Sequence, residues 1–343
     1  MGDPRLQSMV DSLNTMKTRK QGSESIEDIN AFERLVDENI VILSKLIKKD
    51  LVIPQFDDFC NEMERIYNEC KSNEDGQVAC YIPQLARYSN DNWAMSICTV
   101  DGQRFSLGNV ETPFTMQSCS KPFTYGICLN ELGEETVRRY VGHEPSGRNF
   151  NEICLDSHSK LYYRWTRKIV FQNCFCITDK PHNPMLNAGA IMCSALCSTL
   201  IEPKMKNSEK FDYVLSYMKN IAGGSFVGFN NAVFLSERET ADRNYAMAYY
   251  MKENRCFPPK TQLPNIMDLY FQTCSMEVTT ESLAVMGATL ANGGICPTTA
   301  HKVLNPESVR DILSLMFTCG MYNYSGEFAF EVCTNVYSRL HPG

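Results

Sequence analysis

Apolar residues recur every three or four positions through most of this chain, a spacing that predicts helices. Before residue 70, such positions fall in three groups, at 29–36, 40–47 and 56–66. A polar stretch at 71–77 follows and has the composition of a linker. The pattern therefore predicts a small helical N-terminal subdomain over residues 1–72 and a larger domain over residues 73–343.

Clear strand signals are confined to one stretch. Residues 93–100 and 103–108 flank Asp101-Gly102, a pair of residues typical of a tight β-hairpin turn. Because a two-stranded hairpin is not stable alone, we expect further strands to pair with it. Residues 118–320 nevertheless have a mostly helical pattern, and no later run is long enough to supply those strands.

Composition narrows the class of protein. The chain has 343 residues, of which 43% are hydrophobic and 21% charged, with a net charge of −7. This balance is ordinary for a globular chain with a sizeable core, and no Lys- or Arg-rich run indicates nucleic acid or an anionic membrane as a partner. No apolar stretch is long enough to span a bilayer, and no signal peptide or presequence is visible. We therefore expect a soluble intracellular protein.

The sixteen cysteines form no C-x-x-C pair, and the five histidines do not cluster. Cysteines in apolar contexts, such as residues 191–197, are typical of buried thiols in a reducing compartment. We therefore expect neither a disulfide framework nor a metal site.

Candidate chemistry begins at Ser118. Pro122 is tolerated only in the first turn of a helix and Gly133 suits a helix end, so the spacing predicts a helix that begins near Ser118. The helix dipole would favour an alkoxide on Ser118 and disfavour a charged Lys121, one turn away. Such a pair could act as nucleophile and base. The alternative is that Ser118 caps the helix and that Lys121 is a solvated surface charge.

The S-x-x-K pattern is short, and this chain contains it three times. It also occurs at Ser157 with Lys160 and at Ser216 with Lys219. The pattern alone therefore does not identify Ser118 as catalytic.

Four other polar stretches could contribute to a site. Asn187 precedes a helix of small residues, where it could also be an ordinary N-cap. Residues 236–244 are dense in charge, and the alternative is a solvated segment with a capping box made by Ser236 and Glu239. A helix opening at Asp268 carries Tyr270, and an aromatic residue there is usually part of the core. Glycines flank a loop at 320–326, where the backbone could approach a ligand.

Together these stretches resemble the glutaminase family, most closely the animal phosphate-activated, kidney-type glutaminases. The resemblance runs from about residue 3 to residue 330. It rests on YIPQLA (81–86), QSCSKP (117–122), PHNP (181–184), NAGA (187–190), SERE (236–239), DRN (242–244) and GMY (320–322). It implies an α+β fold whose catalytic domain is like that of serine β-lactamases and penicillin-binding proteins, with a mostly antiparallel sheet flanked by helices.

The resemblance implies hydrolysis of L-glutamine to L-glutamate and ammonia. In it, Ser118 is the nucleophile, Lys121 its base and Tyr322 the hydroxyl that bonds the nucleophile and relays protons. The implied substrate-binding set is Tyr81, Gln117, Asn187, Glu237, Asn244 and Tyr270. Among these, Glu237 suits the ammonium of a free amino acid, while Asn187, Asn244 and a tyrosine hydroxyl suit its carboxylate.

The resemblance also bears on cofactors, partners and location. It implies no metal or organic cofactor, phosphate as an activator, and a homotetramer. It favours a mitochondrial location, although without a visible presequence the cytoplasm stays open.

The chain departs from the family pattern at two places. Residues 157–178 form an insertion after a stretch that resembles the family's mobile gating loop (147–155). After Phe330 the family continues with hydrophobic strands, so we expect this chain to lack part of the sheet and one oxyanion donor. That expectation favours an alternative in which the chain is a catalytically impaired form that associates with full-length subunits.

Two further alternatives stay open. A β-lactamase or penicillin-binding enzyme would share Ser118 and Lys121 but not the amino-acid-binding set around Glu237 and Asn244. A cysteine amidase would use Cys119, although no histidine lies nearby in the sequence.

Overall fold

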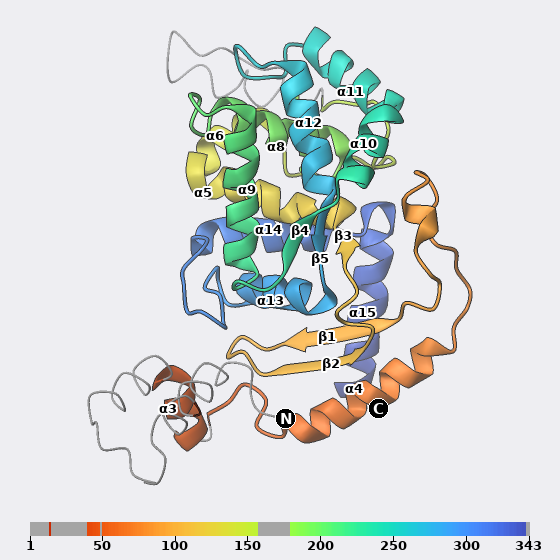
Figure 1. Cartoon of the computed structure of the whole chain (residues 1–343), viewed down its shortest axis with the longest axis vertical. Coiled ribbons are helices and arrows are strands. Elements are labelled where there is room, and N and C mark those ends of the chain that lie inside the picture. The colour runs from red at the N-terminus through yellow and green to blue at the C-terminus, as the bar shows by residue number, and fades with distance from the viewer. Residues whose placement is uncertain (1–13, 15–39, 49, 157–178, 341–343) are drawn as a thin grey trace.

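In the part of the chain that the structure describes, two small antiparallel sheets lie within a mostly helical fold (Figure 1). The structure is a computed structural model that describes residue 14 and residues 40–48, 50–156 and 179–340. The predicted insertion at 157–178, with the S-x-x-K copy at Ser157, and the apolar group at 29–36 lie outside the described residues. The α+β prediction for the larger domain is confirmed in its broad form, because helices dominate and both sheets are antiparallel.

The predicted hairpin is present. Strands β1 (Ala94–Cys98) and β2 (Arg104–Gly108) pair antiparallel. Gly102 supplies the turn with a φ of 82°, and the amide of Thr99 donates to the carbonyl of Gln103 over 3.0 Å. Among the described residues the hairpin pairs with no further strand. Helix α13 (Thr280–Ala291) packs against β1 instead, and α4 (Phe56–Lys71) contacts β2.

The second sheet was not foreseen from the sequence. Its order is β3 (Phe114–Thr115), β5 (Met276–Val278) and β4 (Val227–Phe229), with both pairings antiparallel. Strands of two or three residues are too short to show an alternating pattern. The sheet matters because β3 runs into the segment of Ser118, β4 precedes the helix of Glu237, and β5 follows the helix of Tyr270.

The core is built around three helices, α5 (Lys121–Leu132), α8 (Asn187–Thr199) and α12 (Leu263–Cys274). Helices α5 and α8 are buried along almost their whole length, and α12 packs on α8. As predicted, a proline lies at the first turn of α5 and Gly133 ends the helix, with a φ of 75°. The other helices of this part are α6 (Glu134–Tyr140), α9 (Asn207–Ile221), α10 (Asn231–Glu239), α11 (Asp242–Glu253), α14 (Pro306–Cys319) and α15 (Ser325–Leu340).

Two predicted boundaries are wrong. Helix α12 begins at Leu263 rather than at Asp268, because a proline suits its first turn. The glycine-flanked stretch at 320–326 contains a 3₁₀ turn, η4 (Tyr322–Tyr324), and Gly326 already lies in α15. Helix α15 continues to Leu340, so the last described residues are helical.

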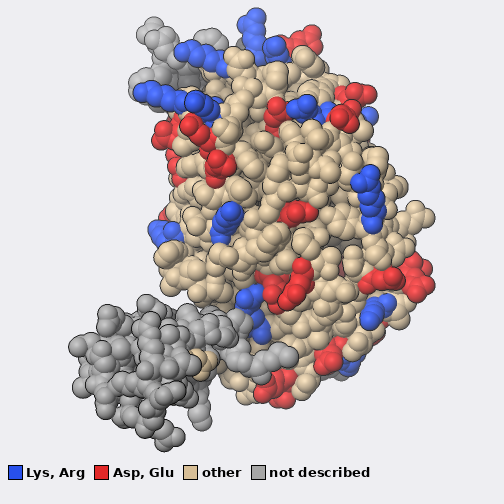
Figure 2. All heavy atoms as spheres, in the orientation of Figure 1, with Lys and Arg blue, Asp and Glu red and all other residues tan. Residues whose placement is uncertain are grey.

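Helices α3 (Ile40–Lys48) and α4 agree with two of the three predicted N-terminal groups. After α4 the chain continues as an exposed segment (73–93) that rises along the right side of Figure 1 and contains the short 3₁₀ turn η2 (Leu85–Arg87). On the face shown in Figure 2, acidic and basic side chains of the described residues are scattered between broad uncharged areas. Within the described ranges, no helix is both long and apolar enough to cross a membrane.

Candidate active site

Lys121 is the first residue of α5 and is only 3% exposed. Its ammonium donates to the carbonyl oxygen of Met185 (3.0 Å) and to Oδ1 of Asn187 (2.7 Å), and it lies 3.4 Å from the hydroxyl of Tyr322. Burial lowers the pKa of Lys121 to about 8, because removing the ammonium from water disfavours the charged form. The alternative of a solvated surface charge is therefore wrong.

Tyr322 connects Lys121 to Ser118. Its hydroxyl lies within hydrogen-bond reach of the Lys121 nitrogen and is hydrogen-bonded to the Ser118 side chain. Burial raises the pKa of Tyr322, and the bond with Ser118 partly offsets that rise. The three polar groups thus form one continuous chain, from an exposed hydroxyl to a buried amine.

Ser118 lies in a 3₁₀ turn, η3 (Gln117–Ser120), that leads directly into α5. Two hydrogen bonds hold this turn: Cys119 N to Met116 O (2.9 Å) and Ser120 Oγ to Gln117 O (2.7 Å). The amide of Met116 in turn donates to Met276 O over 2.8 Å, extending the β3–β5 pairing. The sheet therefore fixes the turn that presents Ser118.

Gln117 and Tyr322 both have left-handed backbones, with φ of 48° and 52°. Neither is a glycine, and this region is disfavoured for large side chains. Such strain is typical of sites where the surrounding structure imposes a conformation for function. Here the two strained residues lie on either side of Ser118, one next to it in the chain and one bonded to its side chain.

A carboxylate lies on the other side of the site. Glu237 is on α10 and only 8% exposed, and the Tyr81 hydroxyl lies 2.7 Å from Gln117 Oε1 and 3.2 Å from Glu237 Oε1. Burial raises the pKa of Glu237, while its hydrogen bonds with Tyr81 and Gln117 lower it. The capping-box interpretation of Ser236 is wrong, because α10 begins at Asn231 and Ser236 is buried near its end.

Tyr270 lies behind this group and is 5% exposed, as expected for a core aromatic residue. Burial raises the pKa of Tyr270 well above its usual value, and nearby Cys274, Glu237, Tyr322 and Tyr81 add to the rise. Cys274, one turn after Tyr270, was not singled out from the sequence. Burial raises the pKa of Cys274 to about 12, so this thiol stays protonated next to Tyr270 and Lys121.

Asn187 joins Lys121 to Asn244, the last of the predicted site residues. Its Oδ1 accepts from Lys121, and its Nδ2 donates to Asn244 Oδ1 over 3.1 Å. The N-cap interpretation is wrong, because Leu186 is the N-cap of α8 and Asn187 is its first residue. The Asn187 side chain is therefore committed to the site rather than to the helix end.

Phe150 was also not foreseen as part of the site. Its ring stacks on that of Tyr322, with centroids 4.5 Å apart, and its carbonyl accepts from the amide of Asn187. The Lys121 nitrogen lies 5.8 Å from the centre of the Phe150 ring. Phe150 belongs to the predicted gating stretch, so that stretch covers one side of Tyr322.

The remaining candidates do not join this cluster. Ser216 and Lys219 are exposed on α9, and Ser216 bonds the carbonyl of Tyr213. Cys119 is next to Ser118, but burial raises the pKa of its thiol, which disfavours the thiolate that a cysteine nucleophile needs. In the described part of the chain, no three His, Cys, Asp or Glu residues are grouped as metal ligands would be.

The site thus brings all nine predicted residues into two connected groups. One is an exposed hydroxyl linked through a second hydroxyl to a buried amine of lowered pKa, with Asn187 and Asn244 alongside. The other is a buried carboxylate with Tyr81, Gln117 and Tyr270. Gln117 and Ser118 are neighbours in the chain, and proximity to both Glu237 and Tyr322 raises the pKa of Tyr270.

Comparison with family models gives two matches. The glutaminase family model matches residues 76–163 and 170–338. An EF-hand domain model matches residues 1–54, most of which lie outside the described residues.

Several relatives are similar over nearly all of the chain. Putative glutaminase 2 of Caenorhabditis elegans is 48% identical over 339 residues, which is 96% of this chain and 52% of that protein. The mitochondrial liver isoform of glutaminase from Mus musculus is 46% identical over 330 residues, covering 96% of this chain and 51% of that protein. A glutaminase of Trichormus variabilis is 40% identical over 267 residues, covering 78% of this chain and 72% of that protein.

Solved structures are similar as well. The native form of Mglu has a TM-score of 0.67 at 29% identity and covers 78% of this chain and 59% of its own. The probable glutaminase ybaS has the same TM-score and identity and covers 79% of each chain. The chain spans about half the length of the animal relatives that it matches.

Proposed function

The chain belongs to the glutaminase family, and on that premise we propose that it hydrolyses L-glutamine to L-glutamate and ammonia through a serine acyl-enzyme. The observation that carries the proposal is the connected chain of Ser118, Tyr322 and Lys121, which ends in an amine of pKa about 8. At pH 7, one unit below that value, about one molecule in ten would hold Lys121 neutral.

The geometry supports a relay through Tyr322. In the neutral amine, Met185 O and Asn187 Oδ1 accept its two protons, which leaves the lone pair for the Tyr322 hydroxyl. Ser118 would then pass its proton to Tyr322 as Tyr322 passes its own to Lys121. The Ser118 oxygen attacks the side-chain carbonyl carbon, the carbon–nitrogen bond breaks, and the relayed proton leaves on nitrogen as ammonia. Water then cleaves the ester, which releases glutamate and restores the Ser118 hydroxyl.

The second group supports recognition of a free amino acid. The ammonium of glutamine would pair with Glu237, a buried carboxylate held by Tyr81. The α-carboxylate would take neutral donors, which Asn244, hydrogen-bonded to Asn187, and the hydroxyl of the buried Tyr270 would supply. A buried site that pairs both charged ends disfavours amides that lack them, since its own polar groups would be left unpaired.

The test is ammonia release from L-glutamine, with L-asparagine and a simple primary amide for comparison. We expect activity with glutamine, none with the simple amide, and a glutamyl adduct on the peptide that contains Ser118 when the reaction is quenched early. Acylation of Ser118 by a β-lactam without glutamine hydrolysis would favour the penicillin-binding alternative instead. A soluble, folded chain without any amidase activity would favour the impaired form that only associates with other subunits.

Three further parts of the proposal come from the family. We propose a homotetramer, activation by inorganic phosphate and a mitochondrial location, the last because the mouse relative is named as mitochondrial. Light scattering, a phosphate titration of the ammonia assay and fractionation of cells that express the complete gene product would test them in turn. A monomer at assay concentration, a flat phosphate response or a cytoplasmic location would each remove the corresponding part.

A further inference from the structure

The segment that carries Tyr81 is almost entirely exposed. Between residues 72 and 98, the only fully buried residues are Ile82 and Leu85, which are 1% and 6% exposed. Tyr81 itself is 61% exposed, although its hydroxyl reaches both Gln117 and Glu237. Apart from these two contacts of its hydroxyl, the packing of neighbouring residues must position Tyr81.

Ile82 and Leu85 form a small apolar cluster with Val233 of α10, and Tyr88 packs against it. This cluster is separate from the main core. Val233 and Glu237 are four residues apart on α10, so they lie on the same face of that helix. Ile82 and Tyr81 are adjacent in the chain, so the packing of Ile82 near Val233 brings Tyr81 to Glu237.

We propose that the packing of Ile82 against Val233 sets the distance from Tyr81 to Glu237, and that both apolar residues are positioning residues for the amino-acid end of the substrate. The proposal rests on the proposed function, since it assumes that Glu237 receives the substrate ammonium. Neither side chain has to touch the substrate. Each acts through the hydroxyl and the carboxylate that it places.

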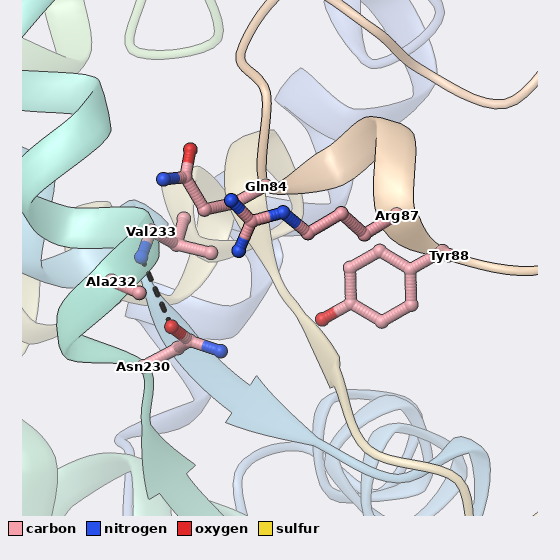
Figure 3. Close-up of a pocket in the computed structure, with 6 residues that line it drawn as sticks. All are labelled: Gln84, Arg87, Tyr88, Asn230, Ala232 and Val233. Carbon is pink, nitrogen blue, oxygen red and sulfur yellow. Dashed lines mark hydrogen bonds between the residues drawn. The ribbon is translucent and has the colours of Figure 1, made fainter.

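An open pocket lies beside the cluster. Its volume is about 210 Å³, and it is lined by Gln84, Arg87, Tyr88, Asn230, Ala232 and Val233 (Figure 3). In this view the Gln84 and Arg87 side chains extend from the exposed segment, while Asn230 lies at the start of α10 and accepts from the amide of Val233. Val233 borders this pocket but is only 1% exposed, so its side chain is enclosed by protein and a larger side chain would overpack the contact.

The test compares Ile82→Ala with Tyr81→Phe in the ammonia assay. We expect each to raise KM for L-glutamine by about tenfold, as the loss of one hydrogen bond to a charged group would, with kcat changed by less than about twofold. The double variant Tyr81→Phe/Ile82→Ala should have the KM of Tyr81→Phe alone, because both changes remove the same contact. Multiplication of the two effects would overturn the proposal.

Three further variants separate positioning from a general loss of stability. Ile201→Ala, a buried residue of the main core, should lower the melting temperature and leave KM unchanged. Ile82→Val should retain a near-normal KM. Val233→Ala should behave like Ile82→Ala. If Val233→Ala and Ile82→Ala leave KM unchanged while Tyr81→Phe raises it, packing does not set the distance and the proposal fails.

A pH profile gives a readout that a merely structural role would not change. The hydrogen bond from Tyr81 lowers the pKa of Glu237, so Ile82→Ala should move the acid-side rise of KM to higher pH, as Tyr81→Phe does. If Tyr81→Phe and Glu237→Gln leave KM unchanged, the substrate assignment of the proposed function is wrong. If those two raise KM and Ile82→Ala does not, only the present inference is wrong.

Discussion

The hydroxyl of Tyr322 lies 3.4 Å from the ammonium nitrogen of Lys121, although 201 residues separate the two in the chain. Their contact requires the turn after α14 to lie over the first turn of α5, and α14 does pack against α5. Because Tyr322 is also bonded to Ser118, the amine has a route to the nucleophile through the tyrosine. The predictions below begin with this relationship.

Tyr322→Phe should lower kcat by roughly 10²–10³-fold, because it removes the relaying hydroxyl. KM should change little, since the ring and its stacking on Phe150 are retained. Steady-state ammonia release measures both constants. The matched control is Tyr324→Phe, two residues away and exposed, which should behave like the wild type. A Tyr322→Phe variant with normal kcat would show that the proton travels by another path.

Ser118→Ala should lower kcat by about 10⁴-fold or more, as loss of a nucleophile does in serine enzymes. Cys119→Ala should leave kcat unchanged, because the adjacent thiol has a raised pKa and no part in the relay. The two variants differ by one position in the same turn, so a difference between them is not a folding effect. The opposite result would restore the cysteine amidase alternative.

The rate should depend on pH through Lys121. The base works when neutral, so kcat should rise with pH and level off above a midpoint near the lowered pKa of about 8. Asn187→Asp would add a negative charge 2.7 Å from the ammonium, which favours the charged form and should move that midpoint upward. A pH–rate profile of both proteins measures the shift. A downward shift, or no dependence above pH 7, would argue against Lys121 as the base.

Glu237→Gln should raise KM for L-glutamine by about 10²-fold, the factor that corresponds to about 3 kcal/mol for a hydrogen bond between charged groups. In the wild type, KM should rise as pH falls, because burial raises the pKa of Glu237 and protonation removes the charge that pairs with the ammonium. Glu239→Gln, on the same helix but exposed, is the control and should not change KM. If Glu237→Gln and Glu239→Gln have the same KM, the ammonium of glutamine does not bind at Glu237.

Gly189→Ala should destabilise the fold by about 1–3 kcal/mol, the usual cost of overpacking. A Cβ at Gly189 would lie 2.0 Å from the carbonyl oxygen of Asn183, so backbone must move in the turn that carries Asn187. Gly287→Ala is the matched control. Nothing lies within 4 Å of a Cβ added at this position, and Gly287 is exposed to solvent in the middle of α13. That change should stabilise by about 0.5–1 kcal/mol, since alanine is the better helix former. Thermal denaturation of the two proteins tests the contrast.

Much of the fold could be predicted because its signals are local. Pro122 and Gly133 mark the two ends of α5, and Asp101-Gly102 marks the hairpin turn. The sheet of β3, β4 and β5 could not be predicted in this way, because its strands are too short to have a period. Its pairings join β5 to segments about 50 residues (β4) and about 160 residues (β3) earlier in the chain, and the sequence pattern carries no sign of them.

The site was predictable in part. The resemblance supplied its residues, but not how they connect. Asn187 and Ser236 both had the local signature of helix caps, and tertiary structure overrode it. The side chain of Asn187 accepts a hydrogen bond from Lys121, and Ser236 is buried. Met185 contributes a carbonyl oxygen and Phe150 a ring face, and neither contribution is tied to a residue type that a motif would reveal. Cys274 became visible only when α12 was placed beside Lys121.

The left-handed backbones of Gln117 and Tyr322 cost the folded state stability, because residues other than glycine disfavour this conformation. Glycine at either position would relax the main chain, and at position 322 it would also delete the hydroxyl that the chemistry uses. Selection for thermal resistance alone would therefore favour variants that no longer turn over substrate. A protein engineer should leave these two positions fixed and look for added stability on the far helices.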